Sequence, residues 1–251
     1  NLSQVGFHSA RHWPDYGTII NAAAYTRVDS AETADGRAAA WATNVCGVAA
    51  LARIATAHQI TLVQISSDYV FDGTHTRPYS EIDPVSPLGV YGQTKAAADQ
   101  IVETVPRHYI VRTSWVIGDG NNFVRTMISL AERGVYPSVV NDQRGRLTFT
   151  SELSRGIRHL IDNGAEFGTY NLTSDGNIYT WAEVARRVFE LVGKKPDRVT
   201  AVSTQQYYQS HSGVFAPRPS NSALDLSKIA STGFVPAQAE ELLRDYVDKY
   251  L

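Results

Sequence analysis

The sequence predicts an α/β fold: a doubly wound parallel sheet joined to a smaller α/β portion at the carboxyl-terminal end. Short runs rich in β-branched residues alternate with long amphipathic stretches, which is the pattern of βαβ units. The clearest β-branched run, 60–65, is followed by polar residues. Open α/β sheets bind ligands at the carboxyl ends of their strands, so these residues lie where a ligand is expected. Apolar residues make up 43% of the 251 residues and charged residues 19%, an ordinary composition for a globular protein.

The expected strands and helices follow one another along the chain. β-Branched and aromatic runs predict strands at 17–21, 60–65, 109–113 and 168–172, with an extended stretch at 198–202. Apolar residues at helical spacing predict helices at 36–58, 92–103, 121–130, 149–163, 179–192 and 236–251, with a short helix that starts at 225–228. The rest of residues 194–225 is expected to be irregular.

Charge and cysteine content narrow the class of protein. The formal net charge is −2, so no basic field indicates a nucleic-acid partner. No run of 18 or more apolar residues predicts a membrane span, and we expect no membrane partner. The single cysteine, Cys46, excludes an internal disulfide and is typical of a reducing compartment, so we expect a cytoplasmic protein with Cys46 as a buried thiol. The seven histidines lack ligand spacing, and no metal site is expected.

The candidate chemistry lies between residues 60 and 95. The apolar strand at 60–65 delivers Ser66 and Ser67 at its carboxyl end. Tyr91 precedes Lys95 by four residues at the start of an Ala-rich helix, so both side chains face the same space. A hydroxyl beside a Tyr/Lys pair suits proton transfer to a carbonyl oxygen. The pKa of a phenol is about 10, and a neighbouring ammonium is expected to lower it.

A glycine-rich nucleotide motif is absent from this sequence. Dinucleotide-binding folds begin with a strand and G-x-G-x-x-G, followed about 20 residues later by an acidic residue for the ribose. The first convincing strand, 17–21, is followed instead by Ala22-Ala23-Ala24-Tyr25. Small side chains there let a cofactor approach the backbone, although a tight turn without a ligand has the same composition. We expect the first βαβ unit to be cut off, disordered or supplied differently, and of these we favour truncation.

Taken together, these phrases resemble the dTDP-4-dehydrorhamnose reductases, a branch of the extended short-chain dehydrogenase/reductase superfamily. The matching phrases keep the family's order over nearly the whole chain: 21–26 with 28–32, 67–73, 91–95, 112–116, 121–124, 142–145 and 218–225. The resemblance implies a Rossmann-like dinucleotide-binding domain at 1–140 and a smaller substrate-binding portion at 141–251, with some substrate contacts from 115–135. Ser67 stands where the family usually has Thr, and Leu147 where it usually has Pro.

The resemblance also assigns roles to individual residues. Tyr91 would protonate the developing alkoxide, Ser67 would hydrogen-bond the same oxygen, and Lys95 would lower the pKa of Tyr91 and hold the nicotinamide ribose. The implied cofactor-binding residues are Ala22, Ala23, Ala24, Tyr25, Tyr91 and Lys95. The implied substrate-binding residues are Thr26, Val28, Asp29, Ser67, Asp68, Tyr69, Trp115, Asn122, Gln143 and Arg218. Asn44 would tie its helix to the active-site backbone.

The implied activity is the NADPH- or NADH-dependent reduction of the C4 ketone of dTDP-4-dehydro-L-rhamnose to dTDP-L-rhamnose. Whether the chain forms a homodimer, and whether magnesium joins subunits, is left open by the resemblance. One alternative is a non-catalytic module such as the regulatory subunit of methionine adenosyltransferase, which shares the fold; the intact Ser67, Tyr91 and Lys95 count against it. Another is a nucleotide-sugar epimerase or dehydratase, and the phrases at 142–143 and 218–219 count against that.

Overall fold

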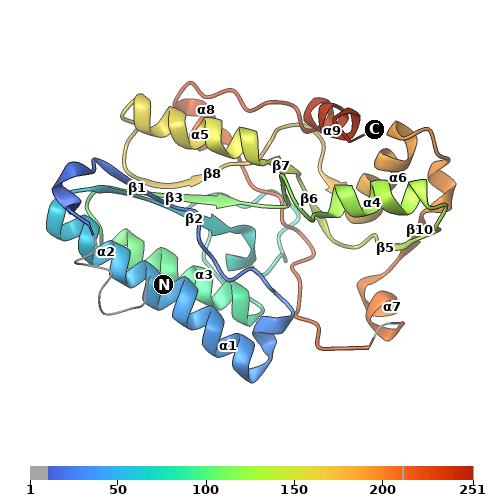
Figure 1. Ribbon diagram of the computed structural model, residues 1–251, viewed down its shortest axis with the longest axis horizontal. Helices are drawn as coiled ribbons and strands as arrows, with labels where there is room; N and C mark the ends of the chain where they lie inside the picture. Colours follow the sequence, from blue (N-terminus) through green and yellow to red (C-terminus); the bar gives the residue numbers. More distant parts are fainter. Residues whose placement is uncertain (1–10, 211, 251) are drawn as a thin grey trace.

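A four-stranded parallel sheet forms the centre of the larger part of the computed structural model, which describes residues 11–210 and 212–250 (Figure 1). The strands lie in the order β1-β2-β3-β8, and all neighbours are parallel. Their bounds are β1 Thr18–Asn21, β2 Thr61–Ser67, β3 His108–Thr113 and β8 Gly168–Asn171. The predicted parallel α/β sheet is therefore confirmed, with β1 at one edge of the described sheet.

Helices cover both faces of this sheet (Figure 1). One face carries α1 (Ala34–Trp41), α2 (Gly47–His58) and α3 (Val90–Glu103), and the other carries α5 (Thr150–Asp162) and α8 (Ser227–Ser231). Successive side chains of a strand point to opposite faces, so Leu62 packs with α2 and α3 while Val63 packs with α5 and α8. This explains why β2 is apolar in both registers, as a strand buried on both faces must be.

A smaller unit packs beside the carboxyl ends of the strands (Figure 1). Its core gathers side chains from α4 (Phe123–Glu132), α6 (Trp181–Leu191) and α9 (Ala239–Asp248). Three two-stranded pairings complete it: β5 (Ser138–Val140) with β10 (Thr200–Val202), β4 (Val116–Ile117) with β7 (Thr148–Phe149), and β6 (Arg144–Gly145) with β9 (Tyr179–Thr180).

The chain passes between the two units more than once. Helix α5, strand β8 and helix α8 all come after residue 140, yet they pack on the larger sheet. The boundary at residue 140 stays a prediction, and these three elements belong to the larger unit in space. A substrate held between the units would therefore touch several separate segments of the chain.

Two local expectations were wrong. Residues 204–209 form a helix, α7 (Thr204–Gln209), inside a stretch expected to be irregular. Ser203 and Gln206 form a capping box at its start, which is a signal readable from the sequence. Cys46 is exposed rather than buried, because the Ala-rich helix that carries it turns this position to the surface.

The predicted helix at 36–58 is interrupted by a π-helical turn, Ala42–Cys46, between α1 and α2. Asn44 lies in this turn and is buried, with its Oδ1 accepting from the backbone N–H of Tyr25 at 2.7 Å. Its Nδ2 donates to the carbonyl of Tyr25 at 3.2 Å and to Oγ1 of Thr94 on α3 at 2.9 Å. The π turn thus aims Asn44 at the chain that leaves β1, and such turns occur frequently at functional sites.

The combined helix Ala34–His58 is long and apolar enough to cross a membrane by length and composition. Half of its most apolar window is buried inside the structure, where α2 packs against β2 and α3. Its apolar character is accounted for by this packing.

Replacing Asn44 by Ala should destabilise the protein by roughly 2–4 kcal/mol, because both backbone polar groups of Tyr25 would lose their partner. Chemical denaturation of the two proteins would measure the difference. The matched control is Asn177→Ala, since Asn177 is exposed and bonds only locally to the hydroxyl of Tyr179. Equal stability of Asn44→Ala and the control would show that Asn44 is dispensable for holding Tyr25.

Candidate active site

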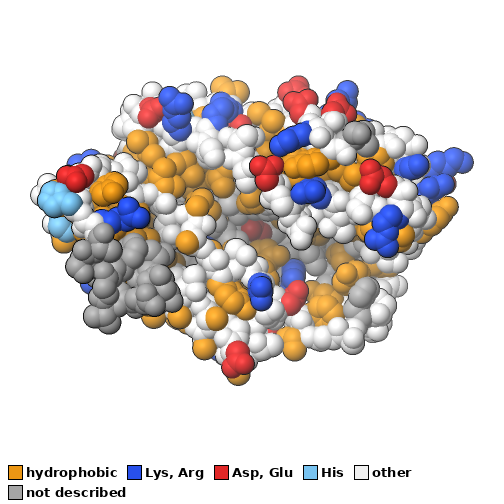
Figure 2. Space-filling view, in the orientation of Figure 1, with side chains coloured by type: hydrophobic (Ala, Val, Ile, Leu, Met, Phe, Trp, Pro, Cys, Tyr) orange, Lys and Arg blue, Asp and Glu red, His pale blue; other side chains and the backbone are white. Residues whose placement is uncertain are grey.

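The three residues predicted to be catalytic come together at the carboxyl end of β2. Ser67 is the last residue of β2, and Tyr91 and Lys95 lie on the first turns of α3, which packs against that strand. The surface between the two units is hollowed, with apolar and charged side chains around the hollow (Figure 2). The predicted gathering of Ser67, Tyr91 and Lys95 is thus present in the structure.

Ser67 and Lys95 are both buried and both hydrogen-bonded. The Ser67 hydroxyl donates to Oδ1 of Asp68 at 3.0 Å and accepts from the N–H of Tyr69 at 3.2 Å, which caps the short 3₁₀ helix Asp68–Val70. The Lys95 ammonium is 3% exposed and donates to the carbonyl of Ile65 at 2.5 Å. Burial lowers the pKa of Lys95 to about 8, and the charge of Asp99 raises it in part.

Tyr91 lies edge-on to Tyr69, with ring centroids 5.8 Å apart. Burial raises the pKa of Tyr91 to about 12, the charge of Asp68 raises it further, and a hydrogen bond with Ser67 lowers it. The expected lowering by Lys95 is not met in this arrangement, because the ammonium is turned to the carbonyl of Ile65. Tyr91 therefore carries its proton near neutral pH.

The carboxyl group of Asp68 is buried from solvent. The residue is 3% exposed, and burial raises its pKa to about 7, against hydrogen bonds with Ser222 and Ser67 that lower the pKa. Its neighbour Tyr69 has its own pKa raised by burial and by the charge of Asp68. Asp68 thus changes charge near neutral pH within reach of the Ser67 hydroxyl.

The residues predicted to hold the cofactor follow β1 directly. Ala22 and Ala23 are exposed, the Ala23 N–H is bound by the Asn21 side chain at 3.2 Å, and Asn44 fixes the backbone of Tyr25. β1 is the neighbour of β2, so this turn lies beside the strand that ends in Ser67. Small side chains over an ordered backbone fit the approach of a nicotinamide ribose.

Asp29 and Arg218 were predicted to contact different parts of a substrate, and in this structure they bind each other. The two nitrogens of the Arg218 fork donate to the two oxygens of Asp29 at 2.8 and 3.0 Å. The N–H of Ala216 donates to Asp29 as well, at 2.9 Å. Burial raises the pKa of Asp29, and the bonds from Arg218 and Ala216 outweigh it, so the net pKa is lowered. This pair ties the segment 216–219 to the chain after β1.

The segment 216–219 also closes over Tyr91. Val28, Tyr69 and Tyr91 meet Ala216, Pro217 and Pro219 around a cavity of about 10 Å³. That space holds no more than a water molecule. A sugar ring does not fit into this particular space as it stands.

Trp115 lies at the entrance of the smaller unit in an unusual backbone conformation. Its φ is +47°, a region that large side chains rarely adopt. The indole stacks on that of Trp181, the first residue of α6, with centroids 3.7 Å apart and planes 14° apart. Its other contact is Gly145, where an added Cβ would lie 2.7 Å from the ring. Strain of this kind clusters at ligand sites, and the role of Trp115 at the substrate stays a prediction.

The remaining predicted substrate residues differ in how free they are. Asn122 caps α4 through the N–H of Arg125, and its amide donates to Gly118 O and to the hydroxyl of Tyr246. Gln143 is buried and donates to Thr204 at 2.9 Å. Thr26 is exposed at the end of the turn that follows β1. Asn122 and Gln143 thus already make hydrogen bonds within the protein, and their contacts with a substrate stay predictions.

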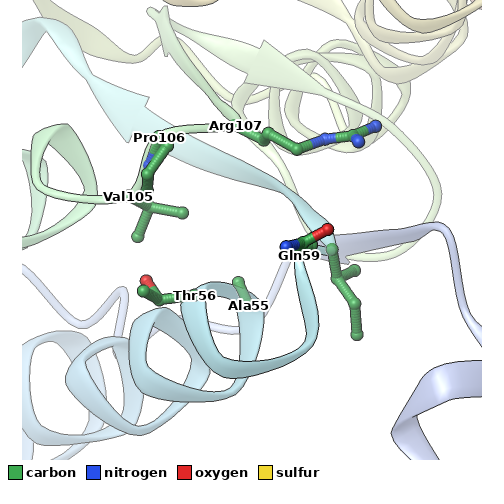
Figure 3. Close-up of a pocket in the computed structure, with 7 residues that line it drawn as sticks. Ala55, Thr56, Gln59, Val105, Pro106 and Arg107 are labelled. Carbon is green, nitrogen blue, oxygen red and sulfur yellow. The ribbon is translucent and has the colours of Figure 1, made fainter.

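A larger cavity of about 300 Å³ lies at the opposite end of the sheet (Figure 3). Gln59 follows α2, and Arg107 comes just before β3, so this cavity opens at the amino ends of the strands. Open α/β sheets bind ligands at the other end. We therefore assign it no part in the reaction.

Sequence reasoning missed several residues that shape the site. Trp181 supports Trp115, Ser222 lowers the pKa of Asp68, and Arg112 forms a buried ion pair with Asp99 one helical turn beyond Lys95. The last pair left a signal in the sequence, since a charged residue interrupts an apolar strand at Arg112 and an acid stands four residues after Lys95. The other two contacts join distant segments and left none.

Comparison with known proteins gives one consistent answer. The family model described as the RmlD substrate binding domain matches residues 8–251. A dTDP-4-dehydrorhamnose reductase from Aggregatibacter actinomycetemcomitans is 36% identical over 90% of this chain and 79% of the relative. A dTDP-4-keto-6-deoxy-D-glucose reductase from Streptomyces niveus is 41% identical over 78% of this chain and 67% of the relative.

Solved structures agree. A dTDP-4-dehydrorhamnose reductase from Clostridium acetobutylicum superposes with a TM-score of 0.90 at 35% identity, covering 99% of this chain and 86% of that one. The Bacillus anthracis dTDP-4-dehydrorhamnose reductase in complex with NADP gives 0.84 at 34% identity, covering 94% and 81%.

The chain belongs to the dTDP-4-dehydrorhamnose reductase family. It is a dTDP-4-dehydrorhamnose reductase-like, NAD(P)H-dependent oxidoreductase, and the RmlD-like fold expected from the resemblance is confirmed. The alternative of a non-catalytic module is set aside on the same findings.

The raised pKa of Asp68 makes stability depend on pH. The folded pKa is about 7 and the ordinary value is 3.8, so the folded protein holds the extra proton between these values. Asp68 therefore makes its full contribution to the free energy of unfolding below pH 3.8, where it is protonated in both states. This contribution is lost as the pH rises towards 7, and it amounts to about 4 kcal/mol at most. Asp68→Asn, which cannot ionise, should therefore become more stable than the parent protein as the pH rises from 4 to 8. Denaturant unfolding of both proteins across this range measures the gap, and a gap that does not change with pH would contradict the burial of a titrating Asp68.

Gly145→Ala should displace the Trp115 indole, because the new methyl group would overlap its ring, at a cost of roughly 1–3 kcal/mol. Near-ultraviolet circular dichroism reports the coupling of the stacked indoles of Trp115 and Trp181, which should weaken. The control is Gly17→Ala, since a Cβ on Gly17 meets nothing within 4 Å. An unchanged spectrum in Gly145→Ala would mean that the Trp pair does not depend on this contact.

Proposed function

We propose that this chain reduces the C4 ketone of dTDP-4-dehydro-L-rhamnose with NADPH or NADH, giving dTDP-L-rhamnose for cell-surface polysaccharide. The observation that carries the proposal is the set of Ser67, Tyr91 and Lys95 at the carboxyl end of β2. The relative from Aggregatibacter actinomycetemcomitans is named for this reaction and matches 90% of the chain.

In this mechanism Tyr91 supplies the proton. Its pKa of about 12 keeps the hydroxyl protonated near neutral pH, which is the form that can protonate an oxygen as negative charge develops on it. Ser67 supplies a second hydrogen bond to the same oxygen. Its hydroxyl now donates to Asp68, so it would turn from Asp68 to the substrate.

Lys95 contributes to the site through the positive charge of its ammonium and through the hydrogen bonds that its N–H groups donate. An ammonium has three N–H donors, and the carbonyl of Ile65 takes one of them. The other two would donate to the nicotinamide ribose and to the Tyr91 side chain. When bound, NADPH or NADH supplies the hydride for C4, and the protein supplies placement and electrostatics. Residues 22–25 would hold the nicotinamide end, and the sequence contains no glycine-rich loop for the pyrophosphate.

The nucleotide sugar would enter by displacing the segment 216–219. A diphosphate offers Arg218 oxygens with the same spacing as a carboxylate, so the Arg218 fork can exchange Asp29 for phosphate. Asp29 would then be free for the sugar hydroxyls, together with Asp68 and Tyr69. The strained, stacked Trp115 would form one wall of the sugar site.

A second substrate is favoured by one specific comparison. The Streptomyces niveus relative is 41% identical and is named a dTDP-4-keto-6-deoxy-D-glucose reductase. Both reactions are the reduction of a C4 ketone on a dTDP-linked 6-deoxy sugar, and the proposed roles of Tyr91 and Ser67 are the same in each. The two substrates differ in stereochemistry at the ring, which the sugar wall around Trp115 and Asp68 would read.

We also infer a cytoplasmic location, which the single cysteine and the nucleotide-sugar chemistry support. The homodimer and the magnesium ion stay predictions. Among residues 11–210 and 212–250 there is no group of three His, Cys, Asp or Glu side chains placed to hold a metal ion, and the mechanism above uses none.

Tyr91→Phe should lower turnover by roughly 10²–10⁴-fold while leaving dTDP binding nearly unchanged, because it removes only the proton donor. Ketone-dependent oxidation of NADPH measures turnover on both dTDP-4-dehydro-L-rhamnose and dTDP-4-keto-6-deoxy-D-glucose, and NMR of the products identifies the sugar formed. The faster substrate distinguishes the proposed reaction from the second one.

The matched control for this experiment is Tyr136→Phe, which removes a hydroxyl from an exposed tyrosine outside the site. It should leave turnover unchanged. Full activity in Tyr91→Phe would overturn the assignment of the proton donor, and turnover of neither sugar by the unchanged protein would overturn the proposed function.

A further inference from the structure

A buried ion pair lies next to the catalytic group and has no part in the mechanism above. Nε of Arg112 and Oδ2 of Asp99 are 3.2 Å apart, and the two side chains are 3% and 1% exposed. Removing two charges from water costs several kcal/mol, and apolar residues in place of such a pair are often as stable. The presence of this pair therefore calls for an explanation other than stability.

The positions of the two residues relate them to Lys95. Asp99 follows Lys95 by four residues on α3, so both side chains lie on the same face of the helix. Arg112 lies in β3 opposite Ser66 of β2. Alternate residues of a strand share one face, and Ile110 packs under α2 and α3, so Arg112 also lies on the sheet face that α3 covers. The order in space is Lys95, then Asp99, then Arg112.

Arg112 is held firmly at its outer end. Its Nη1 donates to the carbonyl of Glu81 at 3.1 Å, and its guanidinium lies 5.3 Å from the centre of the Phe71 ring. A guanidinium stays charged at any pH a protein tolerates. Burial raises the pKa of Asp99 overall, and the charge of Arg112, a hydrogen bond with Ser66 and the charge of Lys95 act against this rise. Arg112 is thus a fixed cation that favours the ionised form of Asp99.

The other groups around Lys95 leave Asp99 as its counter-charge. On β2 the Lys95 ammonium donates to the carbonyl of Ile65, and on α3 the charge of Asp99 raises its pKa. The charge of Asp68, which follows β2, acts on Tyr91. Glu32, from the turn before α1, bonds the N–H of Val90 at the start of α3. Among the described residues, Asp99 is the one whose charge raises the pKa of the Lys95 ammonium.

We propose that Asp99 is a positioning residue for the reaction: held by Arg112, its carboxylate keeps the buried ammonium of Lys95 protonated and directed to the catalytic centre. Arg112 in turn prevents Asp99 from taking the proton of Lys95. The three groups together carry one net positive charge beside Tyr91, where negative charge develops. The role of Lys95 rests on the proposed function, whereas its protonation can be measured without any substrate.

Lysine NMR gives that measurement. The chain has only five lysines, namely Lys95, Lys194, Lys195, Lys228 and Lys249, so ¹³Cε-labelled lysine yields few signals. Lys95→Arg assigns the Lys95 signal by its loss. The midpoint of its titration, followed from about pH 6 to about pH 11, gives the protonation of Lys95 in each variant.

In Asp99→Asn the Lys95 midpoint should fall by roughly 1–3 pH units, because the opposite charge is gone while the Asn oxygen can still accept from Arg112. The other four lysines should not shift. Glu103→Gln is the control: it removes an exposed carboxylate from the same helix and should leave the Lys95 midpoint unchanged. Asp99→Glu should restore most of the parent midpoint.

The variant Asp99→Asn with Arg112→Met covers the case in which an unpaired Arg112 prevents folding, since it removes both buried charges. Its Lys95 midpoint should still lie below that of the parent. An unchanged midpoint in either variant would overturn the proposal. Loss of turnover in Asp99→Asn at neutral pH, recovered as the pH is lowered, is the expected kinetic counterpart. A chain with the expected midpoints but no ketoreductase activity would refute the proposed function and leave the charge assignment intact.

Discussion

A lysine ammonium removed from water is the constraint on which the active site depends. Lys95 is 3% exposed, and burial, opposed by the charge of Asp99, lowers its pKa to about 8. Two groups compensate for the lost water: the carbonyl of Ile65 at the end of β2 accepts a hydrogen bond, and the Asp99 carboxylate lies one helical turn away on α3. The carbonyl comes from a strand that is buried on both faces, and the carboxylate comes from the buried side of α3.

The substrate side of the site is built differently. It includes the segment 216–219, and the pairing of Arg218 with Asp29 fixes this segment to the chain after β1. Asp29 is 44% and Arg218 19% exposed, so water screens the pair and the contact is easily exchanged. The buried catalytic side and the exchangeable substrate side suit a protein that must admit a large, doubly charged nucleotide sugar and then exclude water from the reaction.

Most of the larger unit could be read from the sequence because its signals are local. The β-branched run before Ser67 predicted β2, and the spacing of Tyr91 and Lys95 predicted that they share a helix face. Helix ends were predicted to within a few residues for α3 and α5. The helix α7 was missed although its capping box is a local signal, and Cys46 was placed inside because an Ala-rich helix does not show which side faces the core.

By itself the sequence determined the fold class and the family, and it predicted that Ser67, Tyr91 and Lys95 lie together, since each depends on short phrases along one strand or one helix. Only the tertiary structure decided which charges meet. Asp29 pairs with Arg218 across 189 positions, and Trp115 with Trp181 across the smaller unit. Arg112 reaches Asp99 because β3 lies beside β2, beneath α3. Ion pairing and stacking act through space, and separation along the chain carries no record of them.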